Sequence, residues 1–170
     1  MRISVVGVGN ELKADDGVGL FIADILETTL RKSMKRHTFQ FIRSENPENH
    51  IHRIARFLPE IVLIIDSADF NGNPGEYRLI EEKEVEGYTY STHNAPLTFF
   101  INAVKKTVPS NPEVLLVGIQ PRNTGFGQEM SREVKLCAKD AVRFITDLIK
   151  GEEAAKEEQE KPVRPLKLGD

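Results

Sequence analysis

Residues 2–19 read RISVVGVGNELKADDGVG, and this stretch decides the fold. Residues 2–10 are rich in Val and end in glycines, which predicts a buried strand. The polar loop ELKADDG follows, and from Val18 apolar residues recur with helical spacing, with acidic residues where the helix begins. A strand, a loop and a helix in this order form the repeating unit of an α/β protein.

The same alternation continues along the rest of the chain. Further strands are expected at residues 37–43, 60–66, 76–82 and 114–121, and further helices at residues 47–58, 97–108 and 131–150. The sequence therefore predicts an α/β three-layer fold, with a twisted, mostly parallel (mixed) sheet of about five strands between helices. The turn signal NGNPGE at residues 71–76 predicts a local antiparallel hairpin in that sheet.

We expect residues 1–150 to form a single α/β domain. From residue 151 the composition changes to a charged stretch with almost no large apolar residues and two prolines. Such a stretch cannot bury enough apolar surface to fold by itself, so residues 151–170 are expected to be a solvated, flexible tail.

Charge and composition exclude several classes of protein. The net charge of -3 gives no reason to expect a nucleic-acid partner, which requires a basic face. The longest apolar runs are too short to cross a bilayer, so no membrane insertion is expected. One cysteine, Cys137, cannot form an internal disulfide. These features, and the lack of a secretory h-region, are typical of a cytoplasmic protein.

The glycines of GVGNELKADDGVG at residues 7–19 first suggest a phosphate-binding turn. A dinucleotide-binding loop needs G-x-G-x-x-G, and Leu12 stands where the third glycine belongs. Three acidic residues, Glu11, Asp15 and Asp16, would also repel a pyrophosphate. The sequence therefore disfavours this interpretation.

A helix cap is the ordinary explanation of the two aspartates. Asp15 or Asp16 could accept N–H bonds in the first helical turn and complement the helix dipole. Adjacent residues on a helix point about 100° apart, so one can cap while the other faces a cleft. We expect Asp15 to be mainly structural and Asp16 to face the cleft.

A third interpretation is a cation site. Ligands of open α/β sheets bind beyond the carboxyl ends of the strands. Asp16 follows the first strand, Asp66 ends the apolar run IVLII, and His93 lies in the loop THNAP. Two carboxylates and an imidazole are a plausible ligand set for a borderline divalent ion. Asp66 could instead cap the next turn and His93 could be a loop histidine, so both explanations stay open at this point.

The remaining reactive residues are interpreted as structural. Asp69 precedes NGNPG and is expected to form an Asx turn. Cys137 lies beside the apolar stripe of the last helix and is expected to be a small buried hydrophobe rather than a nucleophile. His50 and His52 are two apart on a predicted helix, so they face different ways and are expected at the surface.

Four motifs together resemble the endopeptidases that mature NiFe hydrogenases. They are GVGNELKADDGVG, IIDSADFNGNPGE, STHNAPL and VGIQP, and the resemblance runs in order from Arg2 to about Leu148. The segments PEN, NPGE, THN and GIQP look closest to the branch that serves hydrogenases of the formate hydrogenlyase type. One departure is RSENPEN at residues 43–49, where many members of the family carry Asp-Gly-Gly-Thr.

The resemblance implies a function and a site. Members of this family remove a C-terminal extension from the hydrogenase large-subunit precursor once nickel has been inserted. Their metal-contacting and catalytic residues fall on Asp16, Asp66 and His93 of this sequence. The nickel is expected to come with the substrate, with none tightly bound to the free protein, which is expected to be a monomer. The alternative is a non-catalytic chaperone that recognises the metal-loaded large subunit.

Overall fold

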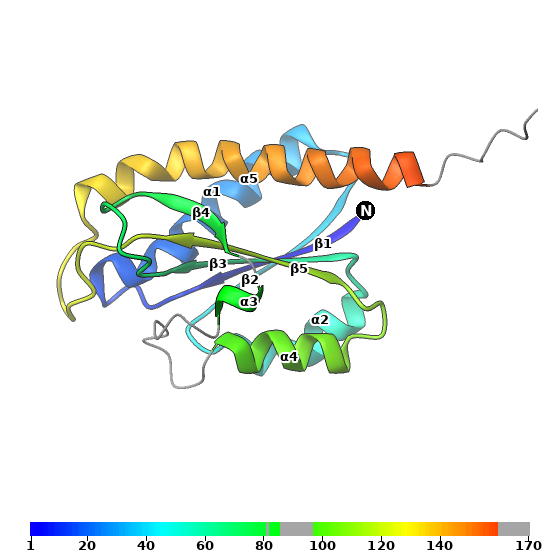
Figure 1. Cartoon of the computed structure of the whole chain (residues 1–170), viewed down its shortest axis with the longest axis horizontal. Helices are drawn as coiled ribbons and strands as arrows, with labels where there is room; N and C mark the ends of the chain where they lie inside the picture. The colour runs from blue at the N-terminus through cyan, green and yellow to red at the C-terminus, as the bar shows by residue number, and fades with distance from the viewer. Residues whose placement is uncertain (81, 86–96, 160–170) are drawn as a thin grey trace, which may run out of the picture.

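We analysed a computed structural model of the chain, which describes residues 1–80, 82–85 and 97–159 (Figure 1). Runs of β-branched and other apolar residues form one five-stranded sheet, with the strand order β2-β1-β3-β5-β4. The strands are β1 (Arg2–Val8), β2 (Thr38–Ser44), β3 (Ile61–Ser67), β4 (Tyr77–Ile80) and β5 (Glu113–Ile119).

The sheet is mixed, as the sequence predicts. β1 pairs in parallel with β2 and β3, and β3 pairs in parallel with β5, whereas β4 is antiparallel to β5. The predicted hairpin is wrong in its partner, because β4 does not pair with β3, the strand that precedes it. β3 already has β1 and β5 as neighbours, so β4 passes β5 and pairs with its free edge.

The helices form a layer on each face of the sheet (Figure 1). One layer contains α1 (Val18–Ser33) and α5 (Arg132–Gln159), and the other contains α2 (Ile51–Phe57) and α4 (Leu97–Thr107). Two short pieces are absent from the sequence-based prediction, namely η1 (Ala14–Gly17) and α3 (Glu82–Val85), and the predicted helix at residues 47–58 begins with a 3-10 turn, η2 (Pro47–His50). In the described part of the chain, no helix combines the length and apolar character needed to cross a bilayer.

Strand β3 lies at the centre of both cores. All seven of its residues are buried, so it packs against both layers. Side chains alternate along a strand. Leu63 and Ile65 accordingly belong to the core under α1 and α5, and Val62 and Ile64 to the core over α2 and α4. A polar residue near the carboxyl end of such a strand therefore contributes little to the packing of either hydrophobic core.

Helix α5 is longer than the sequence indicates. It passes through Gly151 and ends at Gln159, so residues 151–159 continue the helix instead of beginning an irregular tail. Two side-chain contacts link this extension to the amino-terminal edge of the sheet: Glu153 lies 3.3 Å from His37, and Lys156 forms an ion pair with Glu60 at 3.6 Å. These contacts come from distant parts of the chain and are invisible in local composition. Residues 160–170 lie outside the described residues.

Candidate active site

The structure brings the two predicted aspartates to one edge of the sheet. Asp16 lies in η1, which follows β1 after a short loop, and Asp66 lies near the carboxyl end of β3. β1 and β3 are parallel neighbours, so their carboxyl ends meet at the same edge. His93, the third predicted residue, lies outside the described residues.

Asp16 is held in a fixed position. Its Oδ2 accepts a hydrogen bond from the backbone N–H of Asn10 at 3.0 Å, and its Oδ1 accepts one from the hydroxyl of Ser67 at 3.4 Å. The side chain is fully buried. A buried carboxylate is costly unless donors compensate for the lost water, and these two donors do so in part.

Gly9 sets the backbone of Asp16. Its φ is +147°, and a Cβ at this position would lie 1.9 Å from the carbonyl oxygen of Asp16. Only a residue without a side chain lets β1 and η1 approach this closely. The glycines of the opening motif thus position an acid rather than a phosphate.

Asp66 is buried at the same edge as Asp16. Only 2% of its surface is exposed, and the next residue, Ser67, donates to Asp16. By strand alternation Asp66 shares a face with Ile64, toward α2 and α4, while Ser67 faces the other way. Within residues 1–80, 82–85 and 97–159, no three His, Cys, Asp or Glu side chains are grouped as metal ligands would be. The described part of the chain thus contributes two carboxylates to the predicted set.

Asp15 has a different role from Asp16. Its carboxylate accepts three backbone N–H bonds, from Arg122, Asn123 and Ser131, at 2.6–3.0 Å, and a fourth bond from the Ser131 hydroxyl at 2.6 Å. The expected structural role of Asp15 is confirmed, but the expected cap is wrong. Neither η1 nor α1 has a side-chain cap, and Asp15 instead ties the loop after β1 to the loop after β5.

Asp69 forms the predicted Asx turn. Its Oδ1 accepts the N–H of Asn71 at 3.0 Å and the side-chain amide of Gln120 at 3.0 Å. These donors lower the pKa of Asp69. Gln120 also accepts the N–H groups of Phe70 and Gly72, so it organises the whole turn after β3. Gln120 is absent from the sequence-based prediction, although a polar residue after an apolar strand is the same signal that Asp66 gives.

The remaining reactive residues are Cys137, His50 and His52. Burial, with smaller effects of Asp140 and Asp15, raises the pKa of the Cys137 thiol to about 11. The thiol therefore stays protonated at neutral pH and is no nucleophile. It is partly rather than fully buried. His52 is exposed and His50 half-exposed.

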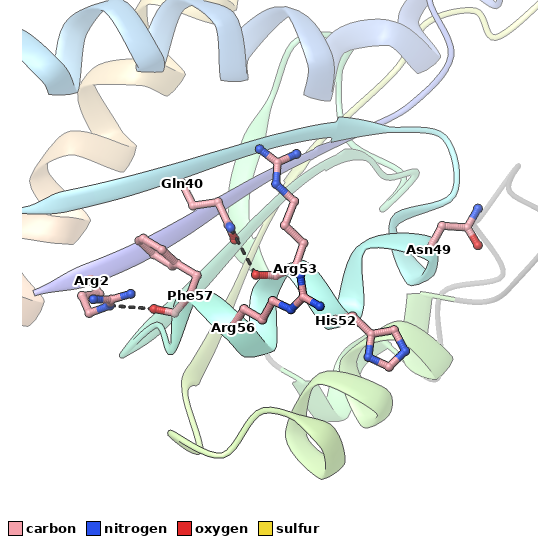
Figure 2. Close-up of a pocket in the computed structure, with 7 residues that line it drawn as sticks. All are labelled: Arg2, Gln40, Asn49, His52, Arg53, Arg56 and Phe57. Carbon is pink, nitrogen blue, oxygen red and sulfur yellow. Dashed lines mark hydrogen bonds between the residues drawn. The ribbon is translucent and has the colours of Figure 1, made fainter.

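A surface pocket of about 640 Å³ lies between β2 and α2 (Figure 2). Arg2 begins β1, whereas Asp16 follows the other end of that strand. The side-chain amide of Gln40 donates to the Arg53 carbonyl in its wall. Its lining contains no carboxylate and consists of Arg2, Gln40, Asn49, His52, Arg53, Arg56 and Phe57. It is therefore separate from the predicted site.

Comparison with known proteins supports one family. Residues 45–148 match the family model HycI, described as hydrogenase maturation protease. The chain is 33% identical to the hydrogenase 3 maturation protease of Escherichia coli over 145 residues, which cover 85% of this chain and 86% of that protein. Both findings agree with the family that the sequence resembles.

Solved structures agree with the fold. The HycI protease of Thermococcus kodakarensis superposes with a TM-score of 0.74 at 28% identity, covering 88% of this chain and 92% of that chain. The endopeptidase HycI of Escherichia coli gives 0.71 at 30% identity, covering 84% and 88%. The predicted fold and peptidase activity are confirmed, and the chain belongs to the hydrogenase maturation protease family.

Proposed function

We propose that this chain removes the C-terminal extension of a NiFe hydrogenase large-subunit precursor after nickel insertion, with Asp16, Asp66 and His93 as the residues that contact the nickel. One observation carries the proposal: two carboxylates, almost completely shielded from water, lie at the carboxyl edge of the sheet in a chain of this family. The relatives are named proteases, which does not favour the chaperone alternative.

Nickel is part of the substrate in this proposal. Carboxylate and imidazole groups suit a borderline divalent ion. Asp16 is already fixed by Asn10 and Ser67, so it loses little further freedom when the nickel-loaded end of the precursor arrives. Because Asp16 and Asp66 are shielded, neighbouring atoms must move aside before the precursor reaches them.

Hydrolysis of the peptide then needs an oriented water and a group that accepts its proton. One of the two carboxylates takes the proton as the water oxygen bonds to the scissile carbonyl carbon, and returns it to the leaving amine when the C–N bond breaks. The polarising charge comes from the nickel that the substrate carries.

The test compares Asp16→Asn, Asp66→Asn and His93→Ala with wild type on purified nickel-loaded precursor. Each variant is expected to lose at least about 99% of the cleavage rate, as removal of a general base or an orienting group does. Asp140→Asn is the matched control, because Asp140 is 63% exposed on the surface of α5, where it pairs with Arg143. Wild-type rates in all three variants would reject these residues as the site.

The second part of the test repeats the cleavage assay with nickel-free precursor. If the site senses nickel, wild-type protein leaves this precursor intact. Equal cleavage of nickel-loaded and nickel-free precursor would reject the sensing step while leaving the peptidase activity in place. The monomeric state and the cytoplasmic location also remain predictions, which sedimentation and cell fractionation test directly.

A further inference from the structure

Exposed apolar side chains gather at the edge that holds the aspartates. Seven large hydrophobic residues are exposed in the described part of the chain. Four of them lie in a loop after a strand or in the first turn of a helix at this carboxyl edge, namely Leu12, Phe21, Phe99 and Phe126. Single exposed apolar residues are ordinary, whereas several of them at one edge of a fold are a candidate interaction surface.

Leu12 and Phe126 lie next to each other. Leu12 is in the loop after β1 and Phe126 in the loop after β5, and their side chains are 61% and 71% exposed. The N–H of Gly127 donates to the Leu12 carbonyl oxygen at 2.7 Å, which joins the two loops at these residues. Figure 1 shows both loops at the same end of the molecule.

Hydrogen bonds hold both loops in place, so the exposure of Leu12 and Phe126 does not result from a flexible segment. Asp15 accepts four hydrogen bonds from the loop after β5, and its own N–H donates to the Asn123 carbonyl oxygen. On the other side, the Asn10 side chain accepts the N–H of Leu12 at 2.8 Å. The loops thus hold Leu12 and Phe126 outward instead of turning them into the core.

This pair is continuous with the candidate active site. Asn10 connects the two, because its side chain holds Leu12 while its backbone N–H binds Asp16 Oδ2. Leu12 therefore lies on the loop that positions Asp16, and the loop that carries Phe126 is hydrogen-bonded to it. A polypeptide substrate with apolar side chains beside its scissile bond matches such a surface, because buried aromatic and aliphatic anchors supply most of the energy in such contacts.

We propose that Leu12 and Phe126 form the docking surface for the precursor segment next to the scissile bond, a segment that carries apolar side chains. The proposal rests on the proposed function, since it assigns substrate recognition to the same site. Neither residue touches the reacting atoms. Their contribution is to hold the substrate, so their loss acts on KM rather than on kcat.

The experiment uses Leu12→Ser and Phe126→Ser in the full chain, with Leu58→Ser and Leu136→Ser as controls. The control residues are 45% and 64% exposed and lie at the end of α2 and on α5. KM for nickel-loaded precursor is expected to rise about tenfold in the first two variants, with kcat within about twofold of wild type. The controls are expected to keep the wild-type KM, and equal changes in all four variants would overturn the proposal.

A binding measurement separates this proposal from the proposed function. The Kd for nickel-loaded precursor is measured with each substitution placed in the Asp66→Asn background, which prevents cleavage, and is compared with the Kd of Asp66→Asn alone, because Asp66 is itself proposed to contact the nickel. If wild type binds without cutting and the Leu12 and Phe126 variants bind about tenfold more weakly, docking is supported and the peptidase proposal fails. Unchanged Kd and KM in these variants would overturn the docking surface alone.

Two further outcomes also decide against the docking surface. If wild type neither binds nor cuts the precursor, both proposals fall. Sedimentation of wild type and Phe126→Ser tests whether a second copy of the chain covers the surface instead. A wild-type dimer that this substitution dissociates would overturn the proposal.

Discussion

At the scale of single residues, two adjacent aspartates divide two tasks. Asp15 and Asp16 are both fully buried, but their carboxylates find donors in different parts of the chain. Asp15 binds residues more than a hundred positions away, and Asp16 binds Asn10 and Ser67. The sequence predicts this division because adjacent residues diverge, but local spacing cannot identify such distant partners.

Removing the Asp15 carboxylate is expected to destabilise the fold. Asp15→Ala leaves the N–H groups of Arg122, Asn123 and Ser131 without their acceptor. Hydrogen bonds to a buried charge are worth about 1.5–3 kcal/mol, so the free energy of unfolding should fall by about 3 kcal/mol. Urea denaturation measures it, with Asp140→Asn as a neutral surface control. A loss below about 1 kcal/mol would show that Asp15 does not brace these loops.

Gly9 is predicted to be intolerant of a side chain. In Gly9→Ala, both the positive φ and the 1.9 Å approach to the Asp16 carbonyl oxygen must be relieved, at a cost of about 2–3 kcal/mol. Gly127 is the matched control, because its φ is +74° but a Cβ added there would meet no atom within 4 Å. Gly127→Ala should therefore cost only about 1 kcal/mol of strain. Equal losses in thermal unfolding would contradict the close approach.

At the scale of the elements, apolar periodicity predicts the five strands and the four main helices. It fails where tertiary contacts decide. The hairpin prediction is local, whereas β4 pairs with β5 because β3 is already central. The sequence predicts the end of α5 at Lys150 because apolar residues stop there, yet His37 and Glu60 lie beside the extension and pair with Glu153 and Lys156.

Gly151 tests the extension of α5. It lies inside the helix, and no atom lies within 4 Å of the position that an alanine Cβ would occupy. Gly151→Ala should therefore raise the free energy of unfolding by about 0.5–1 kcal/mol, since alanine favours a helix more than glycine does. Circular dichroism during thermal unfolding would record the shift. Destabilisation or no change would indicate that the chain at residue 151 is not helical.

Glu152 gives this extension a pH dependence. Burial, and then the charge of Glu113, raises the pKa of Glu152 above its ordinary value. The folded state therefore favours protonated Glu152. The stability that this protonation contributes is fully present below the ordinary pKa of a glutamate and is lost as pH rises through the raised pKa of Glu152 in the folded state. Glu152→Gln should raise the melting temperature at pH 7 but not at pH 4. An equal rise at both pH values would contradict the role of the charge.

At the scale of the whole molecule, topology explains why the site lies where it does. Parallel strands bring their carboxyl ends to one edge of the sheet, so the sequence could predict that Asp16, after β1, and Asp66, near the end of β3, lie at the same edge. Their burial could not be predicted, because it depends on how the surrounding loops close. Local sequence patterns could not predict the exposed pair Leu12 and Phe126 either, because a hydrogen bond between loops far apart in the sequence brings the two residues together.

The most direct test of the central claim is the intact mass of the large-subunit precursor after incubation with this protein. Nickel-loaded precursor should lose the mass of its C-terminal extension with wild type, and should keep its full mass with the Asp16→Asn/Asp66→Asn double variant. Nickel-free precursor should remain whole in both cases. Full-length nickel-loaded precursor after incubation with wild type, or equal cleavage by the double variant, would contradict the account.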